Sequence, residues 1–315
     1  MTERILRIGT RDSKLALWQA KKVQDLLTIK GFYSELIPVK SEGDLDLVTP
    51  LYAMGVQGVF TKTLDAYLLS NKIDIAVHSM KDVPTQLAQG IQQAAVLERA
   101  NYKDLFVYKE NRIYKSYFTS NIDERKTLQG IVATGSVRRK AQLLHRFPGL
   151  TIENLRGNVQ TRMKKLHDNH WDAAIFAAAG LERIGERPEN AVEIDWMLPA
   201  PAQGAIMVVC KTEDKDCFEK ITLLNHQETA ACVKIERDFL KTLMGGCSTP
   251  ISALAEIKDT HMVFKGNILS LDGKEMLEIE KRVSLSNMDD LGVSAANELL
   301  QNGAMKIVED IRKSI

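Results

Sequence analysis

The order strand, helix, strand, helix, strand occurs twice along the chain, and it restricts the possible folds more than any other feature of the sequence. The first copy lies in residues 4–79 and the second in residues 130–178. In each copy, short apolar runs typical of buried strands alternate with segments whose apolar residues recur at helical spacing. This alternation favours mainly parallel sheets with helices on both faces, and ligands at the carboxyl ends of the strands. The sequence therefore predicts two similar α/β lobes that face each other across a cleft.

The pattern changes in the last third of the chain. Residues 196–210 carry two prolines and a glycine before an apolar run, which predicts a hinge that returns the chain to the first lobe as one more strand. A helix at 228–243, strands at 262–270 and 276–285, and one last helix at 288–312 predict a smaller α+β domain. The predicted domains are a discontinuous first lobe at 1–99 and 203–223, a second lobe at 103–199, and a C-terminal domain at 225–315.

Charge and composition exclude several classes of protein. The chain has 42 Lys and Arg against 41 Asp and Glu, a formal net charge of +1, so no overall positive field would recruit nucleic acid. It has neither an apolar run long enough for a membrane span nor the apolar core of a secretory signal, so we expect a cytoplasmic protein without membrane contact. The four cysteines, Cys210, Cys217, Cys232 and Cys247, show neither metal-ligand spacing nor a disulfide pattern, so we expect reduced thiols and no metal site.

Basic and hydroxyl side chains recur where the predicted strands of both lobes end. The basic residues are Arg11, Lys81, Arg138, Arg139, Arg156, Arg162 and Arg183, and the hydroxyl residues include Ser13, Thr134 and Ser136. A single arginine is most often a solvated surface charge, but several basic groups that converge on one cleft repel one another unless an anion compensates them. We therefore expect a polyanionic ligand. Arginine binds carboxylates and phosphates alike, so both a polycarboxylate and a phosphate fit, although the glycine fingerprints of nucleotide sites are missing from the sequence.

Asp82 and Cys247 each allow a structural and a functional interpretation. Asp82 is the one acid among these basic residues. Its structural interpretation is a turn residue or an ion-pair partner of Lys81, and its functional interpretation is a carboxylate that stabilises a transient cation. Cys247 lies in the stretch MGGCSTP after a predicted helix. A helix C-terminus opposes thiolate formation, so local evidence favours an inert thiol, but the two glycines leave room for a bulky group attached to the sulfur. We expect His78, which shortly precedes Asp82 in the chain, to be structural.

Six motifs resemble, in order and spacing, those of the porphobilinogen deaminase family. They are GTRDSKLALWQA at 9–20, DIAVHSMKDVP at 74–84, TGSVRRKAQL at 134–143, NLRGNVQTR at 154–162, AAAGLERIG at 177–185 and GGCSTPI at 245–251. The resemblance spans nearly the whole chain. It implies two doubly wound lobes of the periplasmic-binding-protein type and a smaller C-terminal α+β domain that anchors the cofactor.

The resemblance also implies a reaction and its residues. The family's enzymes are transferases that condense four porphobilinogen molecules head to tail, with loss of ammonia, into the linear tetrapyrrole hydroxymethylbilane on a covalent dipyrromethane cofactor. By resemblance, a thioether attaches this cofactor to Cys247. Asp82 would be the catalytic residue, which hydrogen-bonds pyrrole N–H groups, assists the departure of ammonia and stabilises the azafulvenium cation. The cofactor and the growing oligopyrrole, which are polycarboxylates, would be bound by Arg11, Ser13, Lys81, Thr134, Ser136, Arg138, Arg139, Arg156, Arg162 and Arg183.

The sequence departs from the family pattern in three places. Glu42 and Gln57 stand where many relatives have Arg and Lys, in a loop expected to act as a lid, and Gly135 replaces a serine. The segment at 108–129 is longer than usual, and no function follows from its sequence. We expect a monomer. The alternative class is a two-lobed polycarboxylate-binding or sensing protein without catalysis, which would have no use for Asp82 or for the Gly-Gly-Cys loop.

Overall fold

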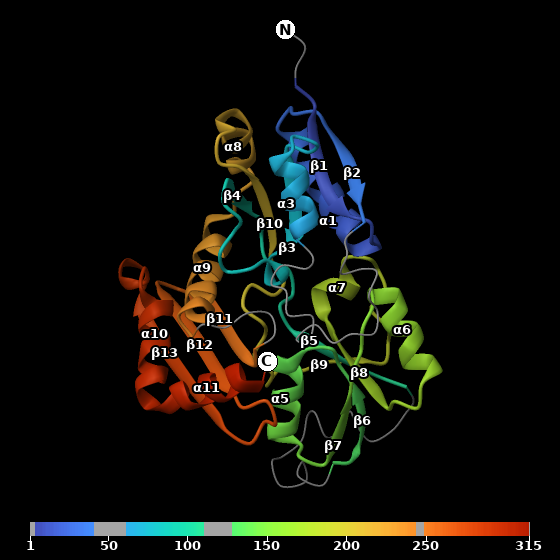
Figure 1. The fold of residues 1–315 in the computed structure, drawn as a ribbon, viewed down its shortest axis with the longest axis vertical. Coiled ribbons are helices and arrows are strands. Elements are labelled where there is room, and N and C mark those ends of the chain that lie inside the picture. Colours follow the sequence, from blue (N-terminus) through green and yellow to red (C-terminus); the bar gives the residue numbers. More distant parts are fainter. Residues whose placement is uncertain (1–3, 41–60, 110–127, 244–248, 315) are drawn as a thin grey trace. The chain divides into compact units, whose positions relative to one another are not determined.

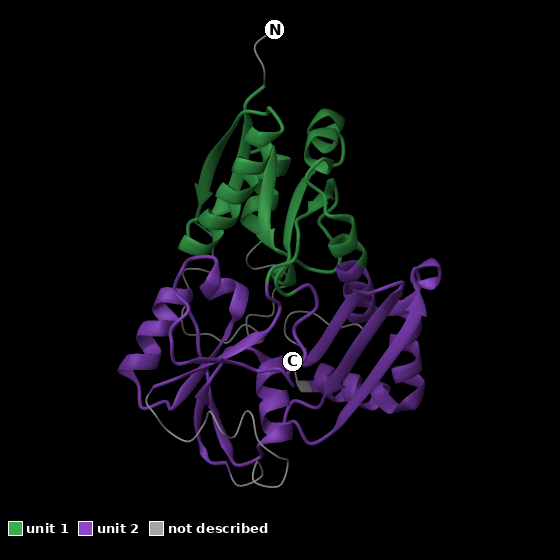
Figure 2. Ribbon diagram, turned by 180° about the vertical axis from the view of Figure 1, so that it is seen from behind, with its two compact units in different colours: residues 1–47, 56–100, 203–231 green, residues 48–55, 101–202, 232–315 purple. Residues whose placement is uncertain are grey.

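A computed structural model describes residues 4–40, 61–109, 128–243 and 249–314 of the chain (Figure 1). These residues belong to two compact units, which are coloured separately in Figure 2. Unit 1 comprises residues 1–47, 56–100 and 203–231, and unit 2 comprises residues 48–55, 101–202 and 232–315. The three domain boundaries expected from the sequence stay a prediction, since the second lobe and most of the C-terminal segment lie together in unit 2.

Unit 1 is an α/β lobe with a five-stranded sheet. Its elements are β1 (Leu6–Arg11), α1 (Lys14–Ile29), β2 (Ser34–Val39), α3 (Lys62–Leu69), β3 (Ile75–Ser79), β4 (Ile91–Val96), β10 (Ile206–Lys211) and α8 (Lys215–Thr222). The strand order is β2-β1-β3-β10-β4. β1 is parallel to β2 and β3, and β10 is antiparallel to β3 and β4, so four strands run in one direction. The predicted return of the chain to the first lobe as one more strand is confirmed by β10.

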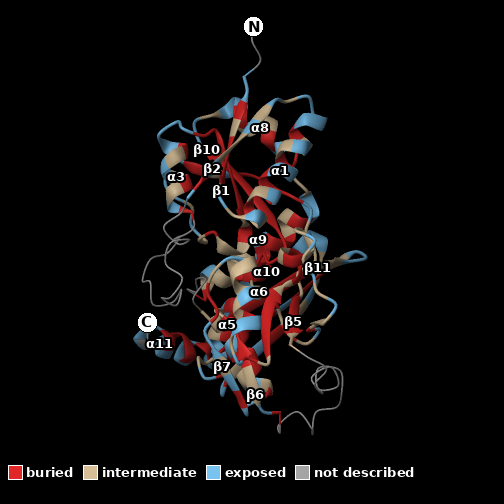
Figure 3. Ribbon diagram, turned by 90° about the vertical axis from the view of Figure 1, so that its right-hand side faces the viewer, coloured by how far each residue is buried: buried red, intermediate tan, exposed pale blue. Residues whose placement is uncertain are grey.

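Local sequence explains how this lobe folds. Ser13 caps α1 by accepting a hydrogen bond from the amide of Ala16 at 3.3 Å, which satisfies one of the free N–H groups of the first turn. Further along α1, Ala20, Val23 and Leu27 recur at helical spacing and are fully buried. They join the buried residues of β1, β3, β4 and β10 in one core. Figure 3 shows β1 and β10 of this sheet as largely buried.

The first part of unit 2 repeats the same architecture. Its elements are β5 (Asp104–Tyr108), β6 (Gly130–Ala133), α5 (Val137–Arg146), β7 (Leu150–Glu153), α6 (Val159–Asp168), β8 (Ala173–Ala177), α7 (Ala178–Glu182) and β9 (Ala191–Glu193). The order β7-β6-β8-β5-β9 again has one strand, β5, antiparallel to its neighbours. Alternate residues of β5 enter separate cores on the two faces, Phe106 on one and Leu105 and Val107 on the other. The prediction of two similar α/β lobes is confirmed.

The C-terminal part of unit 2 is an antiparallel sheet packed against helices. Its elements are α9 (Gln227–Thr242), β11 (Ile251–Lys258), β12 (His261–Leu269), β13 (Met276–Ser284), α10 (Leu291–Leu299) and α11 (Met305–Ser314). α9 begins within unit 1, and from Cys232 onward it belongs to unit 2. Phe239 of α9 and Phe264 of β12 pack edge to face, with ring centroids 5.1 Å apart, in the core of this part. The predicted α+β character is therefore confirmed.

The expected single helix at 288–312 is wrong. A turn of π-helix, Leu300–Ala304, separates α10 from α11. Gly303 within this turn has φ +109°, a left-handed backbone that a continuous helix excludes and that glycine adopts without steric cost.

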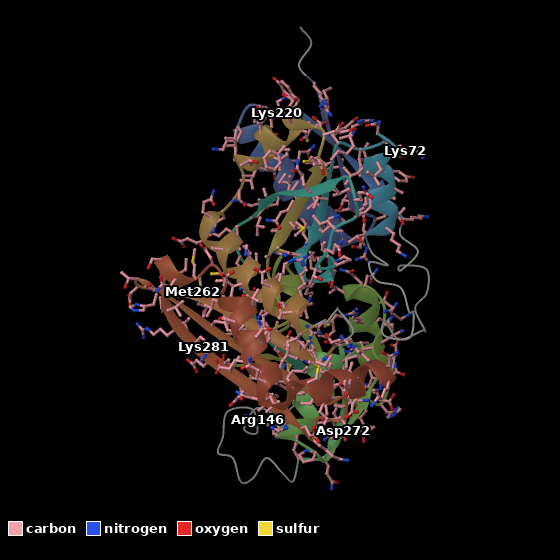
Figure 4. The ribbon with its side chains drawn as sticks, turned by 60° about the vertical axis from the view of Figure 1, so that its left-hand side comes forward. Lys72, Arg146, Lys220, Met262, Asp272 and Lys281 are labelled. Carbon is pink, nitrogen blue, oxygen red and sulfur yellow. The ribbon has the colours of Figure 1, made fainter. Side chains whose placement is uncertain are left out.

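Helix α5 joins the second lobe to the C-terminal sheet. Gln142 donates from Nε2 to the hydroxyl of Ser252 in β11 at 2.9 Å and exchanges two hydrogen bonds with the backbone of Leu198. His145 and the carbonyl of Gly273, in the β12–β13 turn, are hydrogen-bonded at 2.8 Å. Arg146 and Asp272, which follow His145 and precede Gly273 in the chain, mark the two sides of this contact in Figure 4. Within unit 2, the second lobe and the C-terminal sheet are therefore held by specific hydrogen bonds.

Candidate active site

The first group of predicted site residues lies at one edge of the sheet in unit 1. β1 and β3 are parallel neighbours, so their carboxyl ends meet at the same edge. Arg11 is the last residue of β1, and Ser13 caps the following helix. Lys81 and Asp82 lie in a short 3-10 turn, Met80–Asp82, directly after β3. The structure therefore brings these four residues to one end of the lobe.

Two backbone hydrogen bonds fix the turn that carries Asp82. The amide of Met80 donates to the carbonyl of Ala205 at 3.0 Å, and the amide of Val83 donates to the carbonyl of Met80 at 3.1 Å. Lys81 Nζ donates to Gln203 Oε1 at 3.3 Å, and Gln203 is 1% exposed. Gln203 is a residue that sequence reasoning missed, because an amide in a loop carries no signal of its partner.

His78 lies inside the lobe beside this group. It is 6% exposed, and burial, aided by the charge of Arg11, lowers the pKa of His78 to about 4. The imidazole is therefore neutral near pH 7, as expected for a structural histidine. Ser79, the next residue, accepts a hydrogen bond from Nε2 of the buried Gln19 at 2.9 Å, which ties the end of β3 to α1. This role of Gln19 does not follow from its local sequence.

The second group lies at the corresponding edge of the sheet in unit 2. Thr134 follows β6, and its hydroxyl accepts a hydrogen bond from the amide of Ser136 at 3.2 Å. Ser136 caps α5, with its hydroxyl 3.4 Å from the amide of Arg139. Both hydroxyls therefore shape the turn between β6 and α5, and this turn sets Arg138 and Arg139 in the first turn of the helix.

Both of these arginines pair with one buried carboxylate, Asp104, at the start of β5. Arg138 Nη2 lies 2.6 Å from Asp104 Oδ2, and Arg139 Nη2 lies 2.7 Å from Asp104 Oδ1. Asp104 is fully buried, and the two arginines are 4% and 5% exposed. Burial alone would raise the pKa of Asp104, but the charges of Arg138 and Arg139 hold it far below its ordinary value. Asp104 is therefore an ionised carboxylate near pH 7. Asp104 was not among the predicted site residues.

Three further arginines complete this edge. Arg156 follows β7 and is 3% exposed. Arg162, in α6, donates from Nε to the carbonyl of Gly157 at 2.7 Å. Gly157 has φ +114°, so this turn requires glycine. Burial lowers the pKa of Arg183, which follows α7, to about 10, against the opposing charge of Glu182. Within unit 2, all five predicted arginines thus belong to the ends of neighbouring strands or the helices that follow them.

Other predicted residues lie outside the described part of the chain. These are Cys247, Glu42, Gln57 and most of the segment at 108–129. Among the described residues, no group of His, Cys, Asp and Glu side chains could hold a metal ion. No described helix is both long enough and apolar enough to cross a membrane.

Two α/β lobes with arginines at their strand ends are suited to bind an anionic ligand, and comparison with known families shows to which family the chain belongs. Residues 6–219 match the family model described as porphobilinogen deaminase, dipyromethane cofactor binding domain, and residues 230–301 match the porphobilinogen deaminase C-terminal domain. The chain therefore belongs to the porphobilinogen deaminase family.

Solved structures of solute-binding proteins also match. An ancestral cationic amino acid solute-binding protein gives a TM-score of 0.46 at 14% identity, covering 70% of this chain and 87% of its own. A VFT2 domain of BvgS from Bordetella pertussis gives 0.40 at 15% identity, covering 74% and 93%.

Family membership decides between the two classes of function that the sequence left open. The protein is an enzyme of tetrapyrrole biosynthesis with hydroxymethylbilane synthase activity, and dipyrromethane is its cofactor. Its substrate is porphobilinogen. The alternative of a binding or sensing protein without catalysis is not favoured.

Proposed function

We propose that Asp82 is the catalytic residue of this hydroxymethylbilane synthase and that Cys247 carries the dipyrromethane cofactor. We further propose that the cofactor and the growing oligopyrrole are held by Arg11, Ser13, Lys81, Thr134, Ser136, Arg138, Arg139, Arg156, Arg162 and Arg183. In this proposal, residues 225–315 form the cofactor-anchoring domain, and residues 1–99 with 203–223 and residues 103–199 form the two lobes.

The observation that carries the proposal is the buried cluster of Arg138, Arg139 and Asp104. Two guanidinium charges against one carboxylate charge leave +1 in a site where the three side chains are at most 6% exposed. Burying an uncompensated charge is costly, and a carboxylate is the natural partner of a guanidinium. The acetate and propionate groups of a dipyrromethane are such carboxylates, so the residues present fit this cofactor.

When bound, the cofactor supplies the pyrrole carbon to which the first substrate is joined. Arg11 and Lys81 provide positive charge at the edge of unit 1 that carries Asp82, where they bind acidic pyrroles. Asp82 accepts hydrogen bonds from pyrrole N–H groups. Its carboxylate also stabilises the positive charge that develops on the substrate as ammonia leaves. The hydrogen-bonded turn of Met80 and Val83 holds Asp82 in place for both roles.

The remaining proposals concern partners and location. We propose that the enzyme works as a monomer in the cytoplasm, on small molecules and without nucleic acid. The formal net charge of +1 supports the last of these points, because a protein that binds nucleic acid usually carries an excess of basic residues.

The test of Asp82 is the variant Asp82→Asn, which keeps the shape of the side chain and removes its charge. We expect porphobilinogen consumption to fall ~100-fold or more, the usual scale for loss of an acid–base group, while the intact mass still shows the cofactor. The matched control is Asp25→Asn in α1 of the same unit, an exposed acid paired with Lys21, which should retain full activity. Near-normal turnover by Asp82→Asn would remove the residue from its assigned role.

A further inference from the structure

Asp104 is a buried acid that pairs with two of the predicted binding residues, Arg138 and Arg139, and it was not itself predicted. We propose that Asp104 is the positioning residue for Arg138 and Arg139, and that it limits their cluster to a net charge of +1, which one carboxylate of a pyrrole then neutralises. This inference rests on the proposed function of the two arginines.

Asp104 fixes the orientation of both guanidinium groups. Arg138 donates from Nη2 to Asp104 at 2.6 Å and from Nη1 to the carbonyl of Leu198 at 2.6 Å. Arg139 donates from Nε and Nη2 to Asp104 at 3.1 and 2.7 Å, and from Nη1 to the carbonyl of Ile175 at 3.0 Å. Each guanidinium group is thus held on one side by Asp104 and on the other by a backbone carbonyl. Two long, flexible side chains thereby gain one defined orientation.

The charge of the cluster is incomplete without an anion. Arg138 and Arg139 occupy the first turn of α5, where the helix dipole already favours negative charge, and that turn contains no acidic residue. Among the described residues, Asp104 is the only carboxylate that forms an ion pair with either arginine. Arg138 also has an unused hydrogen-bond donor, because its Nε is buried and has no acceptor in the described part of the chain. Both observations point to a carboxylate ligand at this end of α5.

A second cluster, in unit 1, also has two arginines on one aspartate, and there further carboxylates compensate the arginine charge. There, Asp74 accepts from Arg4 Nη2 at 2.6 Å and from Arg7 Nη2 at 2.9 Å. Arg4 also pairs with Asp214 at 2.8 Å and with Asp216 at 3.7 Å, so carboxylates other than Asp74 compensate its charge. Arg4 and Arg7 are also 41% and 35% exposed, so water screens their charges. In the described part of the chain, the cluster of Asp104 has no further carboxylate, and its side chains are buried.

The experiment compares Asp104→Asn with Asp74→Asn, which removes the matched carboxylate of the other cluster. Intact mass gives the fraction of purified protein that carries the two linked pyrroles, and thermal melting gives the stability of each variant. We expect the loaded fraction of Asp104→Asn to fall at least tenfold, while Asp74→Asn loses stability but loads as the wild type does. In the Asp104→Asn protein that remains loaded, KM for porphobilinogen should rise more than kcat falls, because Asp82 is untouched.

The outcomes separate this inference from the function on which it rests. Wild-type protein without added mass would contradict the proposed cofactor attachment itself. Loaded wild type together with equally loaded Asp104→Asn, at an unchanged KM, would overturn only the role of Asp104.

A second measurement applies if Asp104→Asn does not fold. In Cys247→Ser protein, which cannot attach the cofactor, sodium acetate should raise the melting temperature saturably relative to sodium chloride at equal ionic strength. A response to acetate that does not exceed the response to chloride would overturn the inference.

Discussion

Gln142 offers the sharpest test of how the second lobe holds the C-terminal sheet. Its side chain is 5% exposed and makes three hydrogen bonds, two to the backbone of Leu198 and one to Ser252. The variant Gln142→Ala removes all three and leaves the fully buried hydroxyl of Ser252 without this partner. An unsatisfied buried group costs ~1–3 kcal/mol and each of the other two bonds ~0.5–1.5 kcal/mol, so we expect the free energy of unfolding to fall by ~2–6 kcal/mol.

Urea unfolding followed by circular dichroism measures this loss, and hydrogen exchange of the peptide that contains Leu198 locates it. The matched control is Gln160→Ala in α6. Gln160 also donates from Nε2, to both carboxylate oxygens of Glu186 at 2.9 and 3.0 Å, but neither side chain is fully buried. The control should cost less than ~1 kcal/mol, as surface substitutions usually do. Equal costs for the two variants, or unchanged exchange at Leu198, would refute the reasoning.

Two further predictions concern pH and backbone conformation. The pKa of His78 is about 4 in the folded protein against an ordinary value of 6.5. As pH falls from 6.5 to 4, His78 is therefore protonated in the unfolded chain before it is protonated in the folded protein, and the free energy of unfolding should fall. In urea unfolding, His78→Asn should show a weaker dependence of stability on pH, and an unchanged dependence would contradict this. Gly273 has φ +74°, and in Gly273→Ala the new Cβ would lie 2.5 Å from the carbonyl oxygen of Ala141. We expect the free energy of unfolding to fall by ~2–4 kcal/mol. Gly31→Ala, with φ +87° and open space around it, should lose only the ~1–2 kcal/mol of the left-handed backbone; similar melting temperatures for the two variants would count against a tight contact at Gly273.

The two lobes could be predicted from the sequence because each of their strands and helices shows its own apolar periodicity over a short stretch of the chain. The strand at 34–39 was placed as the structure has it in β2, since a local apolar run with strand-forming residues defined it. The helix break at Gly303 was missed because apolar residues continue on both sides of it, in α10 and α11, and a lone glycine does not reveal its own φ.

The site was only partly accessible to sequence reasoning. Arg138 and Arg139 were found because they follow a predicted strand and belong to a recognisable motif. Asp104 was missed because its partners lie 34 and 35 residues further along the chain, and an acid at the start of an apolar strand does not indicate with which base it pairs. Its role depends on the pairing of β5 with β8, which brings Asp104 beside the end of β8. Such non-local pairing is not visible in a local pattern.

The most direct test of the central claim, that this enzyme builds its product on a dipyrromethane attached to Cys247, is the intact mass of the purified protein. The account predicts an excess over the sequence mass equal to two linked pyrroles, and its loss in Cys247→Ser. A wild-type mass equal to that of the bare chain, or an excess that persists in Cys247→Ser, would contradict it.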